Sequence, residues 1–311
     1  MSNPPKQAAA LIAVDWGTSS LRGYLLDAVG TTLDSRATAQ GILHVATGTF
    51  SETLAALTSS WHSREEPLPV LLSGMVGSKQ GWREAPYLDT PASVAGLARN
   101  LLQVDGQRIW IVPGVKQSAV TAAELTHDVM RGEETQIVGA QQDGIFVLPG
   151  THSKWVVVER GGIVRFRTFM TGEVFAALRA HTILARLMQG DLHDAPAFAH
   201  GIRRSKTEPG LLANLFSART AGLFNQIAPE ALSSYLSGLL IGAEFAEAMR
   251  EFGGFAAVKQ PLILNGSAHL VERYGEVAAV FAMPTVAASE DSAARGAFLI
   301  AQAAGIVAPP V

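Results

Sequence analysis

A strand, a tight polar turn and a second strand occur twice in this chain, and the repeat constrains the fold more than any other feature. The first copy spans residues 11–26 and the second spans residues 144–158. They align without a gap, and the matching residues are, in order, Ile12, Val14, Gly17, Thr18 and Ser20 with Ile145, Val147, Gly150, Thr151 and Ser153. A repeat half a chain apart predicts two duplicated domains, each with one hairpin; chance similarity of two hairpins is the alternative.

The turn of the first hairpin carries residues suited to phosphate. Gly17 can adopt backbone angles forbidden to other residues and lets a ligand approach closely. Thr18 and Ser19 offer hydroxyl and backbone N–H donors for phosphate oxygens. Asp15 ends the strand and is an oxygen ligand of the kind that Mg²⁺ prefers. We expect the two hairpins to hold opposite sides of one polyphosphate. The alternative for either hairpin is an ordinary solvated turn between two strands.

Composition excludes several classes of partner. The chain has 311 residues, 48% of them hydrophobic and 16% charged, which is enough for two domains with filled cores. A net charge of −3 gives no basic footprint, so we expect no nucleic acid partner. Without cysteine, a signal peptide or an apolar run of membrane-spanning length, we expect a cytoplasmic protein with no membrane partner. The sequence leaves a homo-oligomer open.

Strands alternate with helices along the chain, which predicts an α/β architecture. Besides the two hairpins, strands are expected at 69–77, 108–114 and 261–267. Polar residues 191–209, with two histidines but no ligand spacing, predict a surface loop. Helices are expected at 50–57 with Ser51 as N-cap, and at 94–102, 121–130, 135–140, 174–188, 211–224, 232–249, from 269 and at 293–304.

Other well-known catalytic motifs are missing from the sequence. It has no Gly-x-x-x-x-Gly-Lys-[Ser/Thr] loop and no Gly-x-Gly-x-x-Gly fingerprint. It also has no His-Glu-x-x-His zinc motif and no Gly-x-Ser-x-Gly nucleophile elbow. If the protein handles phosphate, the paired hairpins must do so.

Three motifs resemble those of the actin-like ATPase superfamily, which contains sugar kinases, heat-shock chaperones and actin. They are the first phosphate motif at 15–19 followed by Arg22, the second at 149–155, and the adenosine motif at 264–267, which has one glycine here instead of a pair. The resemblance implies an α/β fold of two duplicated actin-like ATPase (ribonuclease H-like) domains with a nucleotide cleft between them. We place the domains at 1–143 and 144–311, with the last helix, 289–304, able to pack back on the first domain.

More narrowly, the chain resembles the 2-dehydro-3-deoxygalactonokinase family. The matching segments are spread over most of the chain, at 73–82, 129–136, 148–155, 168–173, 216–220 and 236–242. The resemblance implies ATP-dependent phosphorylation of the 6-hydroxyl of 2-dehydro-3-deoxy-D-galactonate, in galactonate breakdown. The sequence does not separate the galacto from the gluco epimer. The alternatives are another sugar-acid kinase, a polyphosphate or guanosine-phosphate phosphatase, and a non-enzymatic actin-like ATP-binding protein.

Phosphoryl transfer needs charge neutralisation, alignment and a group that accepts the hydroxyl proton. Asp15 is expected to hold Mg²⁺. Superfamily members place an acidic base shortly before the second phosphate hairpin, so Glu134 is the expected base and Glu133 the alternative; a solvated helix start would explain both glutamates equally. The expected ATP-binding residues are Gly17, Thr18, Ser19, Gly150, Thr151, His152, Ser153, Lys154, Asn265 and Gly266.

The carboxylate of a sugar acid calls for Arg or Lys. A loop rich in glycine, cations and aromatics at 78–87 is typical of a ligand site, and in it Lys79 and Arg83 flank Trp82. These three residues are the expected acceptor-binding groups, with Arg167 as a further candidate. Each of the cations could instead be an ordinary surface residue.

Overall fold

Two units of the chain can be described from the computed structural model, which covers residues 8–61, 67–118, 127–190, 192–252, 260–289 and 291–308. Unit 1 comprises residues 1–143, 157–166 and 288–311, and unit 2 comprises residues 144–156 and 167–287. Strands β12 (Ser153–Glu159) and β13 (Gly162–Phe169) contribute residues to both. Each unit is described by itself.

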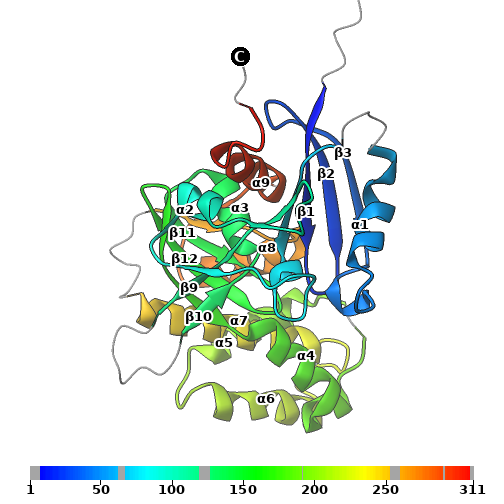
Figure 1. The fold of residues 1–311 in the computed structure, drawn as a ribbon. Helices are drawn as coiled ribbons and strands as arrows, with labels where there is room; N and C mark the ends of the chain where they lie inside the picture. The colour runs from blue at the N-terminus through cyan, green and yellow to red at the C-terminus, as the bar shows by residue number, and fades with distance from the viewer. Residues whose placement is uncertain are drawn as a thin grey trace, which may run out of the picture. The chain divides into compact units, whose positions relative to one another are not determined.

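The described part of unit 1 is built on strands with helices on their faces (Figure 1). Its strands are β1 (Ala9–Trp16), β2 (Leu21–Asp27), β3 (Thr32–Thr38), β4 (Val70–Gly74), β5 (Tyr87–Asp89), β6 (Ala92–Ser93), β7 (Leu102–Gln103), β8 (Ile109–Ile111), β9 (Gly114–Gln117) and β10 (Asp128–Met130). Its α-helices are α1 (Phe50–Thr58), α2 (Val94–Arg99), α3 (Glu133–Ala140) and α9 (Ser292–Ala303), and its 3₁₀ helices are η1 (Ile42–His44), η2 (Ser59–Trp61) and η3 (Met75–Gly77).

The main sheet of unit 1 has the strand order β3-β2-β1-β4-β8-β7, so β1 lies near its centre. β1 pairs with β2 in antiparallel register, with Asp15 opposite Arg22. It pairs with β4 in parallel register, with Asp15 opposite Ser73 and Trp16 opposite Gly74. The carboxyl ends of β1 and β4 therefore lie side by side, which places Asp15 next to the loop that follows β4. A smaller sheet has the order β10-β9-β5.

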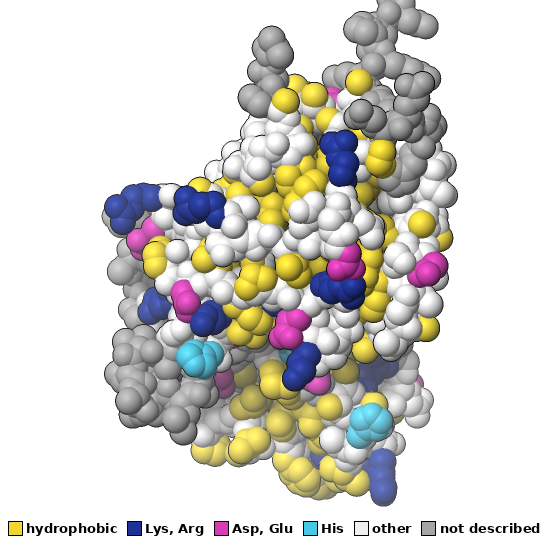
Figure 2. Space-filling model, viewed as in Figure 1, with side chains coloured by type: hydrophobic (Ala, Val, Ile, Leu, Met, Phe, Trp, Pro, Cys, Tyr) yellow, Lys and Arg dark blue, Asp and Glu magenta, His cyan; other side chains and the backbone are white. Residues whose placement is uncertain are grey.

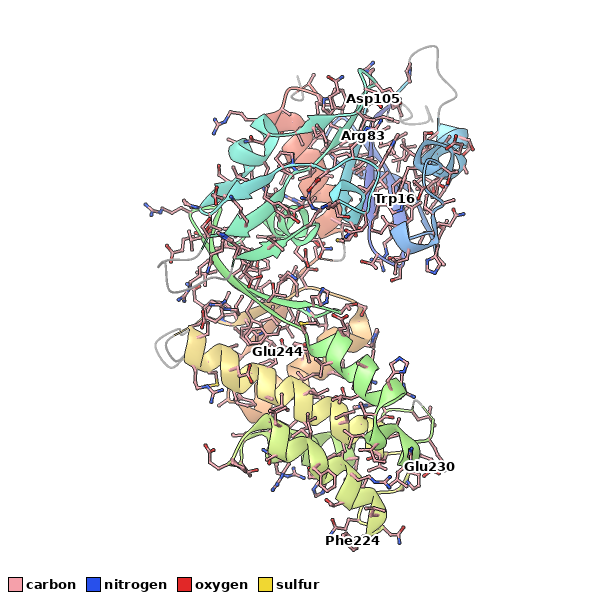
Figure 3. The ribbon with its side chains drawn as sticks, turned by 60° about the horizontal axis from the view of Figure 1, so that its bottom comes forward. Trp16, Arg83, Asp105, Phe224, Glu230 and Glu244 are labelled. Carbon is pink, nitrogen blue, oxygen red and sulfur yellow. The ribbon has the colours of Figure 1, made fainter. Side chains whose placement is uncertain are left out.

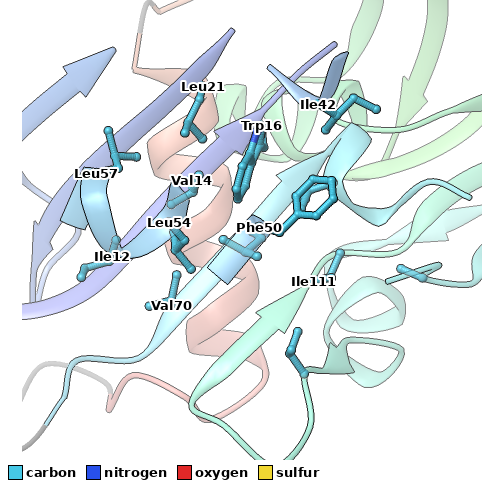
Figure 4. Packing of buried hydrophobic residues seen from close by; sticks show 14 of the residues in the cluster. Ile12, Val14, Trp16, Leu21, Ile42, Phe50, Leu54, Leu57, Val70 and Ile111 are labelled. Atoms are coloured by element: carbon cyan, nitrogen blue, oxygen red, sulfur yellow. The ribbon is translucent and has the colours of Figure 1, made fainter. Parts of the chain in front are cut away.

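Alternating residues of β1 explain how its sheet is covered on both faces. Ile12, Val14 and Trp16 point to one face and pack in a cluster with Phe50 and Leu54 of α1 (Figure 4). The neighbouring strand residues, which point to the opposite face, are buried as well, and α9 contacts β1. Burial on both faces accounts for the unbroken apolar run at the start of the strand.

Helix α3 packs against α9 through glycines. A Cβ atom at Gly139 would lie 1.8 Å from the carbonyl oxygen of Ser292, and one at Gly296 would lie 1.8 Å from that of Thr135. Only glycine permits this distance between the two helix backbones. The start of α3, which carries Glu133 and Glu134, is therefore fixed against a helix from the other end of the chain.

The described part of unit 2 combines strands with a group of packed helices. Strands β15, β14, β11 and β12 lie in that order, and β14 runs parallel to both β11 and β15. Most of α7 is buried, and α5 packs against it where Gly201 meets the backbone of Tyr235. The elements wholly within this unit are β11 (Gly144–Leu148), β14 (Leu262–Leu264), β15 (Thr285–Ala287), α4 (Thr171–His181), η4 (Ile183–Leu187), α5 (Ala195–Ser205), α6 (Leu211–Leu223), α7 (Leu232–Glu251) and α8 (Ala268–Val280).

Two sequence predictions about elements are wrong. The expected surface loop at 191–209 contains α5, which Asp194 caps by accepting a hydrogen bond from the backbone N–H of Ala197. A helix was expected at 121–130, but residues 128–130 form strand β10. Residues 121–126 lie outside the described ones. In addition, α1 has Thr49 and not Ser51 at its N-cap. None of the described helices has the length and apolar character needed to cross a membrane.

Candidate active site

The first hairpin presents an exposed turn that its neighbours hold in place. The N–H of Gly17 donates to the carbonyl of Ser20 at 2.9 Å, and the carbonyl of Gly17 accepts from Ile42 N–H at 3.0 Å. Thr18 and Ser19 are exposed. Gly17 does not have the positive φ that we expected; a Cβ there would make an ordinary contact at 3.5 Å. Gly150 of the second hairpin has open space around its Cβ position, with nothing within 4 Å, so this turn leaves room for a ligand.

Asp15 lies where three segments of unit 1 converge. Gly74, at φ +90°, is so close that a Cβ there would lie 2.8 Å from the carbonyl oxygen of Trp16 and 3.3 Å from Oδ1 of Asp15. A Cβ at Gly132, just before α3, would lie 3.2 Å from the Cα of Gly74. Burial raises the pKa of Asp15 to about 6; the Arg22 guanidinium opposes this shift and the Glu133 carboxylate adds to it. The glycines therefore bring the start of α3 to the end of β1.

The two glutamates at the start of α3 have different surroundings. Glu133 is partly exposed, and its Oε2 accepts from the backbone N–H of Arg131 at 3.0 Å. Glu134 is 0% exposed; it accepts from Gly132 N–H at 2.7 Å and from the Thr135 hydroxyl at 3.0 Å. Burial, with the nearby Glu133 charge, raises the pKa of Glu134 to about 7. The Glu133 charge thus contributes to the raised pKa of Asp15, while Glu134 is buried within the unit.

The described residues contain no group of three or more His, Cys, Asp or Glu side chains that could hold a metal ion by themselves. Mg²⁺ does not require such a group, because it commonly binds one or two carboxylates together with substrate phosphates and water. A single carboxylate, Asp15, beside a phosphate-type turn fits that mode of binding.

The candidate acceptor-binding residues of the loop at 78–87 have different surroundings: two are exposed cations and one packs against the core. Lys79 is exposed. Trp82 stacks on Phe50 with ring centroids 6.5 Å apart and 8° between the planes, so its ring belongs to the edge of the core. Arg83 forms an exposed ion pair with Asp105 at 2.5 Å (Figure 3). Arg167 belongs to β13 and pairs with Glu251 at 2.6 Å, within unit 2. Lys79 and Arg83 thus share a loop, and Trp82 packs beneath it.

Arg131 was missed by sequence reasoning, although it directly precedes the Gly-Glu-Glu segment. It is 8% exposed, lies 4.2 Å from the ring centre of Tyr87, and donates to the carbonyl of Ala85 at 2.9 Å. It therefore ties the loop at 78–87 to the start of α3. The signal that could have identified Arg131 in the sequence is a cation close to two acids, in a segment that is otherwise buried.

The second hairpin is held by the start of α4. A Cβ at Gly172 would lie 2.4 Å from the carbonyl oxygen of Gly150, and the N–H of Glu173 donates to the carbonyl of Thr151 at 3.0 Å. The Glu173 carboxylate pairs with Nε2 of His152 at 2.6 Å. Lys154 is buried, and its Nζ donates to the carbonyl of His152 at 3.3 Å. Thr151 is exposed on the turn.

Other residues of unit 2 lie beside or below this hairpin. Asn265 is buried, with its N–H on the carbonyl of Val147 at 3.0 Å, and a Cβ at Gly266 would lie 3.4 Å from Pro149. The structure thus brings the expected adenosine segment next to the second phosphate segment. Ser153 is 0% exposed, and its hydroxyl lies 2.7 Å from that of Tyr274, so it points into the unit and away from the turn surface.

Known proteins are similar to this chain over most of its length. A model of the family described as 2-keto-3-deoxy-galactonokinase matches residues 15–300. The 2-dehydro-3-deoxygalactonokinase of Escherichia coli (strain K12) is 36% identical over 288 residues, which cover 92% of this chain and 94% of that protein. A solved structure from Sinorhizobium meliloti, provisionally named 2-dehydro-3-deoxygalactonokinase, is 34% identical with a TM-score of 0.84 and covers 94% of this chain and 98% of its own.

A more distant solved structure is informative about the fold alone. The activator of 2-hydroxyisocaproyl-CoA dehydratase from Clostridium difficile is 12% identical, with a TM-score of 0.52 over 95% of this chain and 96% of its own. The fold is that of the α/β actin-like ATPases and sugar kinases, as the resemblance implied. The chain belongs to the 2-keto-3-deoxy-galactonokinase family. It is therefore a phosphotransferase. This confirms the prediction of a kinase over the phosphatase and the non-enzymatic ATP-binding protein.

Proposed function

We propose that this chain transfers the γ-phosphoryl group of ATP to the 6-hydroxyl of 2-dehydro-3-deoxy-D-galactonate, in the breakdown of galactonate. One observation carries the proposal beyond the family match: Gly74 and Gly132 bring the start of α3 to the end of β1, where Glu133 influences Asp15. Acids gathered beside a phosphate-type turn suit phosphoryl transfer to an alcohol. An ATP-dependent step also supports the expected cytoplasmic location.

We assign ATP to the two hairpins. Thr18, Ser19 and Thr151 are exposed donors; a Cβ at Gly150 would meet nothing within 4 Å, and one at Gly17 would meet only Ser20, at 3.5 Å. Asn265 and Gly266, beside Pro149, are assigned to the adenosine. Of the remaining expected contacts, His152 and Lys154 keep a direct role, whereas Ser153 supports the turn from beneath. We propose that the domains divide between residues 143 and 144, although residues 157–166 and α9 group with the first unit.

Mg²⁺ is assigned to Asp15. Its carboxylate supplies the hard oxygen ligand that this ion prefers, and a bound cation would favour the ionised form that burial disfavours. The ion would neutralise charge on the phosphates.

We assign the general base to Glu133 in preference to Glu134. A base must come within hydrogen-bond distance of the proton that it removes. Glu133 is partly exposed and its charge influences the pKa of Asp15, whereas Glu134 is fully buried with both oxygens bound within its own segment. Burial therefore supports the reverse of the order expected from sequence, and we assign Glu134 the role of holding the helix start.

The acceptor carboxylate is assigned to Lys79 and Arg83, the exposed cations of the loop at 78–87, with Arg167 as a second choice because Glu251 already neutralises it. Trp82 is assigned a supporting role beneath this loop.

A homo-oligomer is also proposed. Helix α6 exposes Leu212, Phe216 and Leu223, and hydrophobic side chains gather over it at the lower end of Figure 2. An exposed apolar surface of this kind is typical of an interaction site.

A coupled assay tests the proposed function. ADP release is measured with a panel of 2-keto-3-deoxy sugar acids that includes both the galacto and the gluco epimer, and the phosphorylated carbon is located by ³¹P NMR. We expect release that depends on the acid, fastest with the galacto epimer, and a 6-phosphate product. Phosphate release without an acceptor, or turnover only with another class of alcohol, would overturn the proposal.

A further inference from the structure

A buried carboxylate of unit 2, Glu244, lies beneath the second hairpin and has no role in the reaction as proposed. It belongs to α7 and is 3% exposed (Figure 3). Its Oε1 accepts from the indole N–H of Trp155 at 2.8 Å, and its Oε2 accepts from the hydroxyl of Tyr274 at 2.7 Å. The Tyr274 oxygen in turn lies 2.7 Å from the Ser153 hydroxyl. A continuous chain of hydrogen bonds therefore runs from the hairpin to Glu244.

This arrangement is costly for a residue without a function. Taking a carboxylate out of water is unfavourable unless hydrogen bonds or an opposite charge compensate. No Lys, Arg or His among the described residues forms an ion pair with Glu244. Burial raises its pKa, and hydrogen bonds from Thr171, Trp155, Tyr274 and Ser153 oppose the shift. Among the residues that the structure describes, neutral donors compensate the acid, so each must be correctly placed.

The donors come from three different elements around the hairpin. Trp155 lies on the hairpin's second strand, Thr171 is the first residue of α4, and Tyr274 lies on α8. The start of α4 also contacts the turn itself, through Gly172 against the Gly150 carbonyl. One side chain of α7 therefore fixes the second strand of the hairpin from beneath and, through α4, its turn.

We infer that Glu244 is a positioning residue for ATP: acting through Tyr274 and Ser153, and through Thr171, it holds the Gly150–Ser153 turn in the conformation that binds phosphate. The inference rests on the proposed assignment of this hairpin to ATP. Glu244 itself does not touch the nucleotide. Preorganised donors bind an anion better than mobile ones, because their ordering cost has been met on folding.

The most direct test is Tyr274→Phe, which removes the hydroxyl between Ser153 and Glu244 and keeps the ring. Calorimetry on the full chain, without any sugar acid, gives the affinities for ATP and for adenosine. We expect ATP to bind about tenfold more weakly, which is the effect of one neutral hydrogen bond, and adenosine to bind as in the wild type because it has no phosphates. The matched control is Tyr235→Phe, which removes another Tyr–Ser pair (2.6 Å to Ser217) of the same unit, away from the hairpin, and leaves both affinities unchanged.

A second variant, Glu244→Gln, tests the acid itself. If Glu244 and Tyr274 act through one chain of hydrogen bonds, the double variant loses no more ATP affinity than the weaker-binding single variant. Equal losses for ATP and adenosine, or a Tyr274→Phe variant that matches its control, would overturn the inference and leave Glu244 a purely structural residue. If Glu244→Gln does not fold, Tyr274→Phe alone decides. If the wild type binds ATP but phosphorylates no sugar acid, the proposed reaction is refuted. The inference about Glu244 is then still decided by the affinities for ATP and adenosine.

Discussion

At the scale of single residues, exposure separates two neighbouring glutamates that the sequence cannot distinguish. If Glu133 is the base, Glu133→Gln should lower kcat by about 10²–10⁴-fold, which is the usual contribution of general-base catalysis. Glu134→Gln should lower kcat by less than about tenfold, because its fully buried carboxylate has no access to substrate. Steady-state kinetics of both variants with the acid and with ATP would measure the difference.

Each glutamate variant serves as the control for the other, since the two residues are adjacent and undergo the same substitution. ATP affinity should stay within about threefold of the wild type in both, because neither glutamate is assigned to the nucleotide. A large kcat loss confined to Glu134→Gln would restore Glu134 as the base and show that its carboxylate becomes accessible when substrates bind.

The raised pKa of Glu134 also predicts a dependence of stability on pH. Between the ordinary value of 4.5 and the folded value of about 7, the folded protein keeps a proton that the unfolded chain has lost, so stability falls as pH rises through this window. The shift corresponds to about 3 kcal/mol. Urea unfolding at pH 4.5 and 8 should therefore show Glu134→Gln gaining up to that amount relative to the wild type at the higher pH. Parallel pH profiles would contradict the assignment.

Local sequence reasoning found the residues whose neighbours in the chain carry the signal. Asp15 ends an apolar strand before a polar turn, and both acids of α3 follow a glycine. Glu244 gave no such signal, because it is one of three glutamates in a long helix and its partners Trp155 and Tyr274 are 89 and 30 positions away. Its role depends on tertiary contacts, which periodicity and motifs do not encode.

At the scale of elements, the position of α3 depends on glycines in two helices. Gly296→Ala would place a methyl group 1.8 Å from the carbonyl oxygen of Thr135, so the helices must separate. We expect a loss of about 3 kcal/mol or more in unfolding free energy, and a lower kcat because the acids at the start of α3 shift. Gly275→Ala in α8 is the control: its Cβ would meet nothing within 4 Å, and a helical Gly→Ala change should stabilise by up to about 1 kcal/mol. Equal melting temperatures for the two variants would refute this account.

The elements predicted correctly include β1, a buried apolar run, and the long apolar segments that form α6 and α7. Helix α5 was missed because histidines and glycine make its segment look polar, although Phe198 and Ile202 are buried at helical spacing. Its cap, Asp194, and a proline in the first turn were the available signals. β10 was taken for a helix because a three-residue strand is too short to show a period.

At the scale of the whole molecule, the repeat of the hairpin has an energetic consequence that neither unit shows alone. A ligand that binds only the folded state stabilises it by RT ln(1 + [L]/Kd), about 2.7 kcal/mol when the ligand is at a hundred times its Kd. If both hairpins contact one ATP, substitution in either hairpin must reduce the same stabilisation. If the two hairpins formed independent nucleotide sites, a substitution in one hairpin would reduce only the stabilisation contributed by the ATP bound there.

We therefore expect Thr18→Val and Thr151→Val each to weaken the single ATP binding event by about ten- to a hundredfold, since each removes a hydrogen-bond donor to a charged phosphate. Thr38→Val and Thr207→Val, one in each unit and outside the assigned site, should bind ATP as the wild type does. Calorimetry supplies the stoichiometry and the affinity, and thermal unfolding with and without ATP supplies the stabilisation. One ATP per chain, weakened by both hairpin variants, is the result that a shared nucleotide requires. A Thr18→Val variant with unchanged affinity would confine the nucleotide to unit 2 and remove the first hairpin from the proposed mechanism.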